Sequence, residues 1–136
     1  MIYLTRRERF SSAHRMFRTE LTDSENYELY GQCSNPEWHG HNYELFVTVK
    51  GEMDKKYGYR MNLTKLKTII RKHVIDKLDH MNLNTQVDFM KDKLASTENI
   101  AIAIWEILEE EIKKEGAYLH CIKVAETENN YIEYYG

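Results

Sequence analysis

The sequence predicts an α+β fold in which four antiparallel strands form one sheet and two helices cover one of its faces. Three observations predict this class: two long segments with alternating apolar side chains open the chain, two segments with helical apolar spacing follow, and two short alternating segments close it. A β-β-α-α-β-β order of this kind is typical of an antiparallel sheet with its helices on one side. The 136 residues include a single proline and no repeat or linker, so residues 1–136 are expected to form one domain.

The first strand is expected at residues 2–14. Because side chains alternate along an extended chain, Phe10, Ser12 and His14 should share one face of it. The polar stretch at residues 18–38 has little periodicity, which predicts a long loop with room for a short helix. Loops of this length inside a small domain are usually functional.

A second strand is expected at residues 39–51, where apolar side chains occupy alternate positions, and it should pair with the first. Two shorter strands are expected at residues 117–126 and 131–135. The side chains that share one face of the second strand are His41, Tyr43, Leu45, Val47 and Val49.

Two helices are expected between the strand pairs. Asn62 or Thr64 can cap the first, which should run to about Lys77. The second should begin at Ser96, whose hydroxyl suits an N-cap, and end at Gly116. Their apolar stripes consist of Leu66, Ile69, Ile70, Val74 and Ile75 in the first helix, and of Ile100, Ala101, Ile104, Trp105 and Leu108 in the second.

Charge and hydropathy argue against two classes of partner. The net charge is -3, the pI is about 6.1, and Lys and Arg are scattered, so no nucleic acid is expected to bind. No stretch approaches the roughly 20 apolar residues that cross a bilayer, so no membrane partner is expected. The start of the chain lacks the order of charged and then apolar residues found in a signal peptide, which predicts a cytoplasmic protein whose two cysteines are free thiols.

Three histidines form a candidate metal site. His39 and His41 are two residues apart on a predicted strand, so their side chains point the same way, and Gly40 leaves the backbone between them uncrowded. His14 ends the strand that should pair with theirs. Three imidazoles would leave a zinc ion with an open position, as in catalytic sites. The spacing alone is equally compatible with surface or hydrogen-bonded histidines.

Cys33 lies on the loop that leads into the second strand, where it could stand over the open position of that metal. Nearby positive charge favours a thiolate, which suits a base or a nucleophile. An idle loop cysteine is the alternative. Cys121 lies in an alternating apolar strand and is expected in the core.

Two further groups carry ionisable side chains after regular elements. Asp79 and His80 follow a helix, where a carboxylate could fix the tautomer of the imidazole so that the pair acts as a general acid. Glu126 ends a strand, and its carboxylate could accept two hydrogen bonds from a guanidine-like edge. A turn explains both equally well, and helix capping explains Thr97 and Glu98.

Five runs of residues, in order along nearly the whole chain, together resemble the 6-pyruvoyl-tetrahydropterin synthase and 6-carboxy-tetrahydropterin synthase superfamily. Each run alone is weak evidence for the family, but five runs in this order and with this spacing are hard to produce by chance. The runs are FSSAHR at residues 10–15, CSNPEWHGHNY at 33–43, LDH at 78–80, STEN at 96–99 and ETENN at 126–130.

The resemblance implies the tunnelling fold (T-fold), in which trimers close into a barrel and two trimers stack into a homohexamer with active sites between subunits. It implies that His14, His39 and His41 bind Zn²⁺, with Mg²⁺ as a possible additional requirement. The implied activity is that of a lyase, which converts the pterin 7,8-dihydroneopterin triphosphate to 6-pyruvoyl-tetrahydropterin with loss of triphosphate. Arg15 and Arg18 are candidates for binding the triphosphate.

The same resemblance implies roles for the other groups. Cys33 would be the general base, and Asp79 with His80 would form a proton relay contributed across a subunit interface. The remaining implied residues bind substrate: Glu126 would anchor the pterin, and Thr97 and Glu98 would line its pocket.

The product and the class of activity stay open at this point. Five residues separate Cys33 from His39, which resembles the pyruvoyl-forming type, whereas the type that makes 6-carboxy-tetrahydropterin for queuosine and releases acetaldehyde usually has three. Glu37 and Trp38 depart from the Asn-Gly common in animal enzymes. A non-catalytic pterin- or metal-binding module is the alternative of another class. The three histidines argue against a metal-free dihydroneopterin aldolase.

Overall fold

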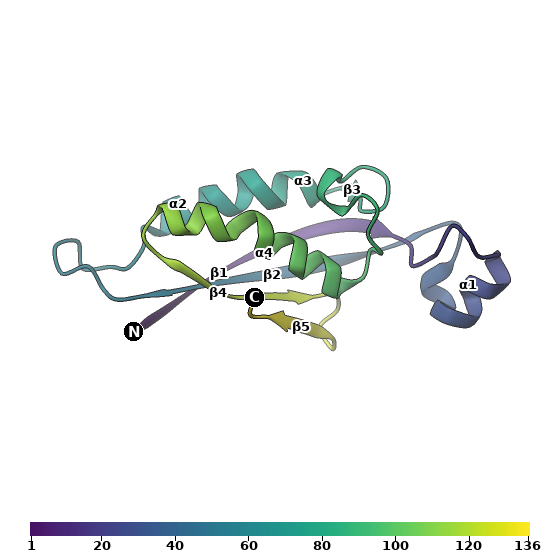
Figure 1. The fold of residues 1–136 in the computed structure, drawn as a ribbon, viewed down its shortest axis with the longest axis horizontal. Coiled ribbons are helices and arrows are strands. Elements are labelled where there is room, and N and C mark those ends of the chain that lie inside the picture. The colour runs from purple at the N-terminus through teal and green to yellow at the C-terminus, as the bar shows by residue number, and fades with distance from the viewer.

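One mixed five-stranded sheet forms the base of the structure, a computed structural model that describes residues 1–136 (Figure 1). The strand order is β3-β1-β2-β4-β5. Apart from β3, neighbouring strands are antiparallel. The four antiparallel strands are β1 (Ile2–His14), β2 (His39–Gly51), β4 (Tyr118–Ala125) and β5 (Tyr131–Tyr134).

The expected four-stranded, wholly antiparallel sheet was wrong in one respect, because β3 (Met81–Asn82) adds a fifth strand that runs parallel to β1. It pairs with Ser12 and Ala13. The backbone of His80, which has a φ of 63°, turns the chain into this strand. Two residues are too few for alternation to reveal a strand in the sequence.

Two helical segments cover one face of the sheet (Figure 1). The first comprises α2 (Leu63–Ile70), a π-helical turn (Arg71–Ile75) and α3 (Asp76–Leu78) in direct succession. The Asn62 side chain caps it by accepting bonds from the amides of Thr64 and Lys65. The second is α4 (Thr97–Lys114), whose N-cap is Ser96, as expected. None of the helices is long and apolar enough to span a bilayer.

The long loop carries the short helix for which the sequence left room. This helix, α1 (Asp23–Tyr30), begins with a reciprocal capping box between Thr22 and Glu25 and lies at one end of the molecule, away from the other helices (Figure 1). A 3₁₀ turn (Gly31–Ser34) follows it, and another 3₁₀ turn (Asp88–Met90) precedes α4.

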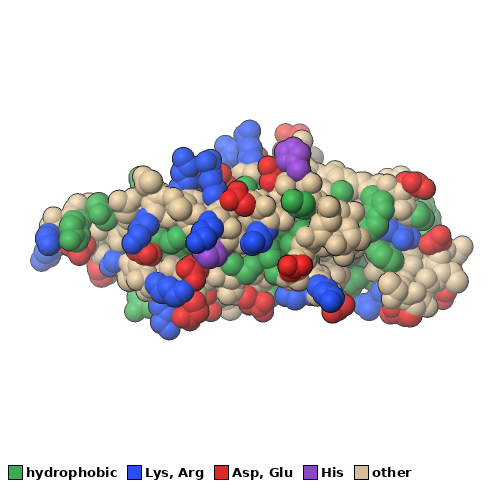
Figure 2. All heavy atoms as spheres, turned by 90° about the horizontal axis from the view of Figure 1, so that it is seen from above, with side chains coloured by type: hydrophobic (Ala, Val, Ile, Leu, Met, Phe, Trp, Pro, Cys, Tyr) green, Lys and Arg blue, Asp and Glu red, His purple; other side chains and the backbone are tan.

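The hydrophobic core lies between the sheet and the helices and contains 26 buried residues. Side chains from β2, including the fully buried Tyr43 and Leu45, pack against the apolar faces of α2 and α4. Acidic and basic side chains are interspersed over the helix-covered face, with no block of one sign (Figure 2). This face therefore offers no basic stripe of the kind that binds polyanions.

Candidate active site

The register of β1 and β2 brings the three candidate metal ligands together. His14 lies directly opposite His39, and His41 is two residues further along β2 on the same face. The ring centroids are 4.5 Å apart for His14 and His39, 5.1 Å for His14 and His41, and 5.0 Å for His39 and His41. One nitrogen from each ring can be chosen so that all three lie within 4.8 Å of one another. This separation fits three ligands around one ion.

The hydrogen bonding of the cluster also fits a metal. Nδ1 of His14 lies 2.7 Å from the carbonyl oxygen of Ala95, so it carries the proton and leaves the lone pair on Nε2. That Nε2 is buried without a partner, as are both ring nitrogens of His39 and Nε2 of His41. Buried polar atoms normally have partners, and a metal ion would satisfy this set.

Burial sets the protonation state of the cluster. Loss of solvent lowers the pKa of His14, His39 and His41, although the nearby carboxylate of Glu126 acts in the opposite direction on each. The three rings are therefore neutral near pH 7. Neutral imidazole is the form that binds metal.

The metal-free protein is expected to lose stability as the pH falls below 6.5, the ordinary pKa of histidine. Below that value the unfolded chain takes up protons that the buried cluster resists, so the free energy of unfolding decreases with falling pH until the folded rings also titrate. Urea denaturation at about pH 7.5 and about pH 5.5 measures this difference. A His39→Asn variant should show a smaller difference, and an equal one would contradict this origin.

Cys33 lies beside the histidine cluster, in the 3₁₀ turn that follows α1, and it is exposed. It lines one cavity together with His39 and His41, and a second cavity together with His14 and Glu126. The thiol thus stands at the junction of two cavities that meet at the candidate metal site. A base at the position of Cys33 can therefore reach a ligand that is held at the candidate metal site.

The candidate pterin-binding residues line the second of these cavities. Thr97 and Glu98 come from the start of α4, and Glu126 follows the end of β4. Oγ1 of Thr97 donates to Oε2 of Glu126 at 2.6 Å. Oε1 of Glu126 lies 3.3 Å from Nε2 of His41 without the alignment of a hydrogen bond. The carboxylate is thereby held next to the cluster with one oxygen still able to accept.

The structure does not bring Asp79 and His80 next to Cys33 within one chain, although His80 lines a separate cavity with His41. Neither lines a cavity that Cys33 lines. Nδ1 of His80 lies 3.1 Å from Oδ2 of Asp79, and the His80 side chain is 83% exposed at the edge of the sheet. The amide of Ser11 donates to Asp79 at 2.8 Å and, together with His80, lowers the pKa of that carboxyl. The expected pair therefore exists as an ionised carboxylate beside an exposed imidazole.

Comparison with known proteins places this geometry in a family. The family model described as 6-pyruvoyl tetrahydropterin synthase matches residues 3–136. The chain belongs to the 6-pyruvoyl tetrahydropterin synthase family. The resemblance carried by the five sequence runs is thus confirmed.

Two of the similar proteins match this family member over nearly its whole length, and a third matches about half of it. The 6-pyruvoyl tetrahydrobiopterin synthase of Dictyostelium discoideum is 44% identical over 135 residues, which cover 99% of this chain and 96% of that protein. The solved structure of 6-pyruvoyl tetrahydropterin synthase from Caenorhabditis elegans matches with a TM-score of 0.91 at 36% identity, and covers 99% of this chain and 95% of that one. A 6-carboxy-5,6,7,8-tetrahydropterin synthase of Haemophilus influenzae is 30% identical over 69 residues, or 48% of each chain.

Sequence reasoning missed one polar group beneath the site of this 6-pyruvoyl tetrahydropterin synthase family member. Tyr43 was assigned only to an apolar strand face, but its ring contacts those of His14 and His41 at centroid distances of 6.2 and 5.5 Å. Its hydroxyl is buried without a partner, and burial raises its pKa. The sequence contains the information that places Tyr43 at the site, since Tyr43 follows His41 by two positions and so shares its strand face.

Proposed function

We propose that this chain converts 7,8-dihydroneopterin triphosphate to 6-pyruvoyl-tetrahydropterin with release of triphosphate. The observation that carries the proposal is the cluster of His14, His39 and His41, whose cavities also contain Cys33 and Glu126. A metal site, a base and an acceptor for the pterin ring are the three parts that this chemistry requires. The relative from Dictyostelium discoideum, named for this type of product, matches almost the whole chain.

Zn²⁺ is the metal that we assign to the cluster. Neutral imidazoles suit zinc, whereas Mg²⁺ prefers oxygen ligands, so the three nitrogens of His14, His39 and His41 favour zinc at this site. A zinc ion bound there would polarise the side-chain oxygens of the substrate and so acidify the neighbouring C–H bonds. The Ala95 carbonyl holds the His14 ring in the tautomer that this ligation needs.

The protein groups around the metal then bind the substrate and move its protons. Cys33 is the base that takes a proton from the substrate side chain. Glu126 accepts hydrogen bonds from the 2-amino group and N3 of the pterin, and the Thr97 hydroxyl fixes the orientation of that carboxylate. Glu98 lines the same cavity.

The proposed catalytic unit is a homohexamer of two stacked trimers with the T-fold. Asp79 and His80 do not share the cavities of Cys33, so we assign the proton relay at each site to a neighbouring subunit. The sheet has free edges for such assembly, because β1 pairs with β3 only at Ser12 and Ala13 and β5 pairs only with β4. The free Cys33 and Cys121 suit a cytoplasmic location.

The test is an anaerobic incubation of the zinc-loaded protein with 7,8-dihydroneopterin triphosphate, with products identified by mass spectrometry. We expect 6-pyruvoyl-tetrahydropterin and triphosphate, formed at least about 10²-fold more slowly by a Cys33→Ala control. A 6-carboxy product with acetaldehyde would instead assign the chain to the queuosine type of synthase. Binding of the pterin without turnover would support a non-catalytic module.

A further inference from the structure

The proposed base, Cys33, lies on a segment outside the sheet, whereas the proposed metal ligands lie on the two strands that this segment connects. The segment that carries Cys33 leaves the sheet directly after His14 and returns to it at His39. Its helix α1 lies at the end of the molecule, away from the helices that pack on the sheet (Figure 1). The position of Cys33 relative to the metal site therefore depends on the few contacts that attach this segment.

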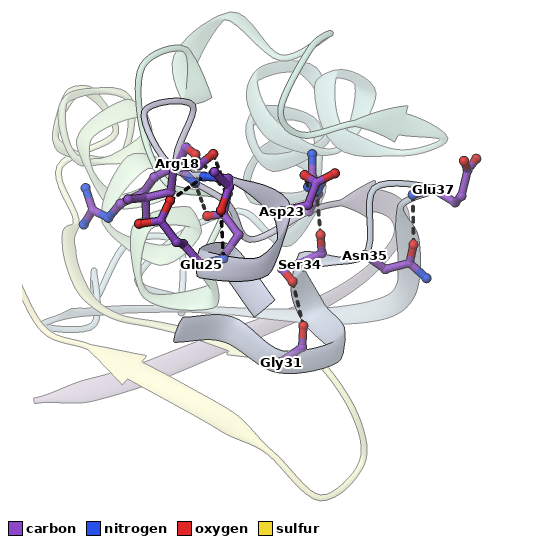
Figure 3. Close-up of polar contacts among 11 residues, drawn as sticks. Arg18, Asp23, Glu25, Gly31, Ser34, Asn35 and Glu37 are labelled. Atoms are coloured by element: carbon purple, nitrogen blue, oxygen red, sulfur yellow. Dashed lines mark hydrogen bonds and ion pairs between the residues drawn. The ribbon is translucent and has the colours of Figure 1, made fainter. Parts of the chain in front are cut away.

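Most polar contacts of the segment are internal and cannot supply this attachment. Oγ of Ser34 donates to the Gly31 carbonyl at 2.7 Å, and the Glu37 amide donates to Asn35 at 2.9 Å (Figure 3). These bonds shape the turn around Cys33. They do not connect it to the strand that holds His14.

Arg15 makes the connection. Its Nε donates to the carbonyl oxygen of Ser34 at 2.7 Å, and one terminal nitrogen lies 3.1 Å from Oδ1 of Asp23 at the start of α1. The guanidinium also packs over the ring of Phe17, 4.2 Å from its centroid. Only 11% of the Arg15 side chain is exposed. One side chain thus binds both the turn after Cys33 and the beginning of α1.

Arg15 is itself held firmly. Asn84 bonds its backbone twice, accepting from the Arg15 amide and donating to its carbonyl oxygen, both at 2.9 Å. The next residue, Met16, donates its amide to the Cys33 carbonyl at 2.8 Å. Arg15 directly follows the metal ligand His14, so two hydrogen bonds, from the Arg15 side chain to Ser34 and from the Met16 amide to Cys33, link this short stretch to the turn that carries the thiol.

We propose that Arg15 is a positioning residue that holds the Cys33 turn against the histidine cluster. This inference rests on the proposed function, in which Cys33 acts as base. It replaces the expectation that Arg15 binds triphosphate, because the guanidinium is largely buried and its donors point at Ser34 and Asp23. The bond to the Ser34 carbonyl matters more than the pairing with Asp23, whose side chain is 76% exposed and hence solvated.

Three variants test the proposal. Arg15→Met keeps the packing on Phe17 and removes the hydrogen bonds. Arg15→Lys keeps the charge without the planar fork that reaches two acceptors at once. Arg7→Met is the matched control, since Arg7 is an exposed β1 residue that lines no cavity with Cys33, Asp79 or His80. The measurements are bound zinc, amide hydrogen exchange at residues 31–34, kcat and KM.

For Arg15→Met we expect unchanged zinc content, exchange at residues 31–34 faster by about tenfold, and kcat lower by about 10²-fold with KM within about twofold. Arg15→Lys should recover part of kcat, and Arg7→Met should match the parent protein. Unchanged exchange in both Arg15 variants would overturn the proposal. So would a raised KM with an unchanged kcat, which marks a phosphate ligand.

Zinc content and hydrogen exchange need no turnover. If the parent protein is inactive, the proposed function fails, while the exchange data still decide whether Arg15 holds the turn. If Arg15→Met does not fold, Arg15→Lys supplies the same comparison.

Discussion

A His39→Ala variant is expected to lose stoichiometric zinc and at least about 10²-fold in turnover. Two imidazoles remain, which are too few to hold zinc in a three-ligand catalytic site. The metal-free fold should persist, because the substitution removes two buried nitrogens that have no partner. Elemental analysis of the purified protein and calorimetric zinc titration measure the loss directly.

The matched control is His73→Ala. His73 lies in the π-helical turn, with Nε2 3.7 Å from Glu111, and takes no part in the cluster. This variant should bind one zinc per chain with the affinity of the parent. One zinc per chain in His39→Ala as well would show that the metal lies elsewhere.

A Cys33→Ala variant is expected to keep its zinc and lose about 10²- to 10⁴-fold in kcat, the usual contribution of a general base. Cys33 is not part of the three-nitrogen set, so the metal should remain. The side chain is exposed, so its truncation leaves no cavity in the core. Zinc analysis together with steady-state kinetics separates the two effects, and loss of zinc would make Cys33 a ligand instead of a base.

Mixing extends this test to the assembly. His80→Ala should also lose most of its turnover as a pure protein, because it lacks the relay. If the relay comes from a neighbouring subunit, mixed oligomers of Cys33→Ala and His80→Ala contain some sites with both groups intact and regain activity. Mixtures as inactive as the pure variants, once exchange of subunits is verified by mass, would place both groups in one subunit.

The sequence was most informative where chemistry and periodicity coincide. The two-residue spacing of His39 and His41 determines that their side chains share a strand face, and pairing of the two long strands brings His14 opposite them. The caps at Asn62 and Ser96 likewise follow from local hydrogen bonding. These features depend on contacts that a short stretch of sequence specifies.

Other features depend on contacts between distant residues. The strand at Met81–Asn82 forms only because the turn at His80 lays it along β1, and nothing in its two residues requires that. The direction of the Arg15 side chain depends on where Ser34 lies after the loop has folded. The three histidines of the candidate metal site could thus be named from the sequence, whereas the contacts that hold the Cys33 turn in place could not.

The start of α4 connects the two ends of the site. Ala95 holds the His14 ring through its carbonyl, and Thr97, two residues later, holds the carboxylate of Glu126. The stretch that leads into α4 therefore fixes the position of the Glu126 carboxylate relative to the histidine cluster. If the cluster holds the metal and Glu126 the pterin ring, as proposed, this distance selects substrates by length: a substrate whose hydroxyls lie one carbon closer to its ring, or one further away, would reach one end of the site but not both.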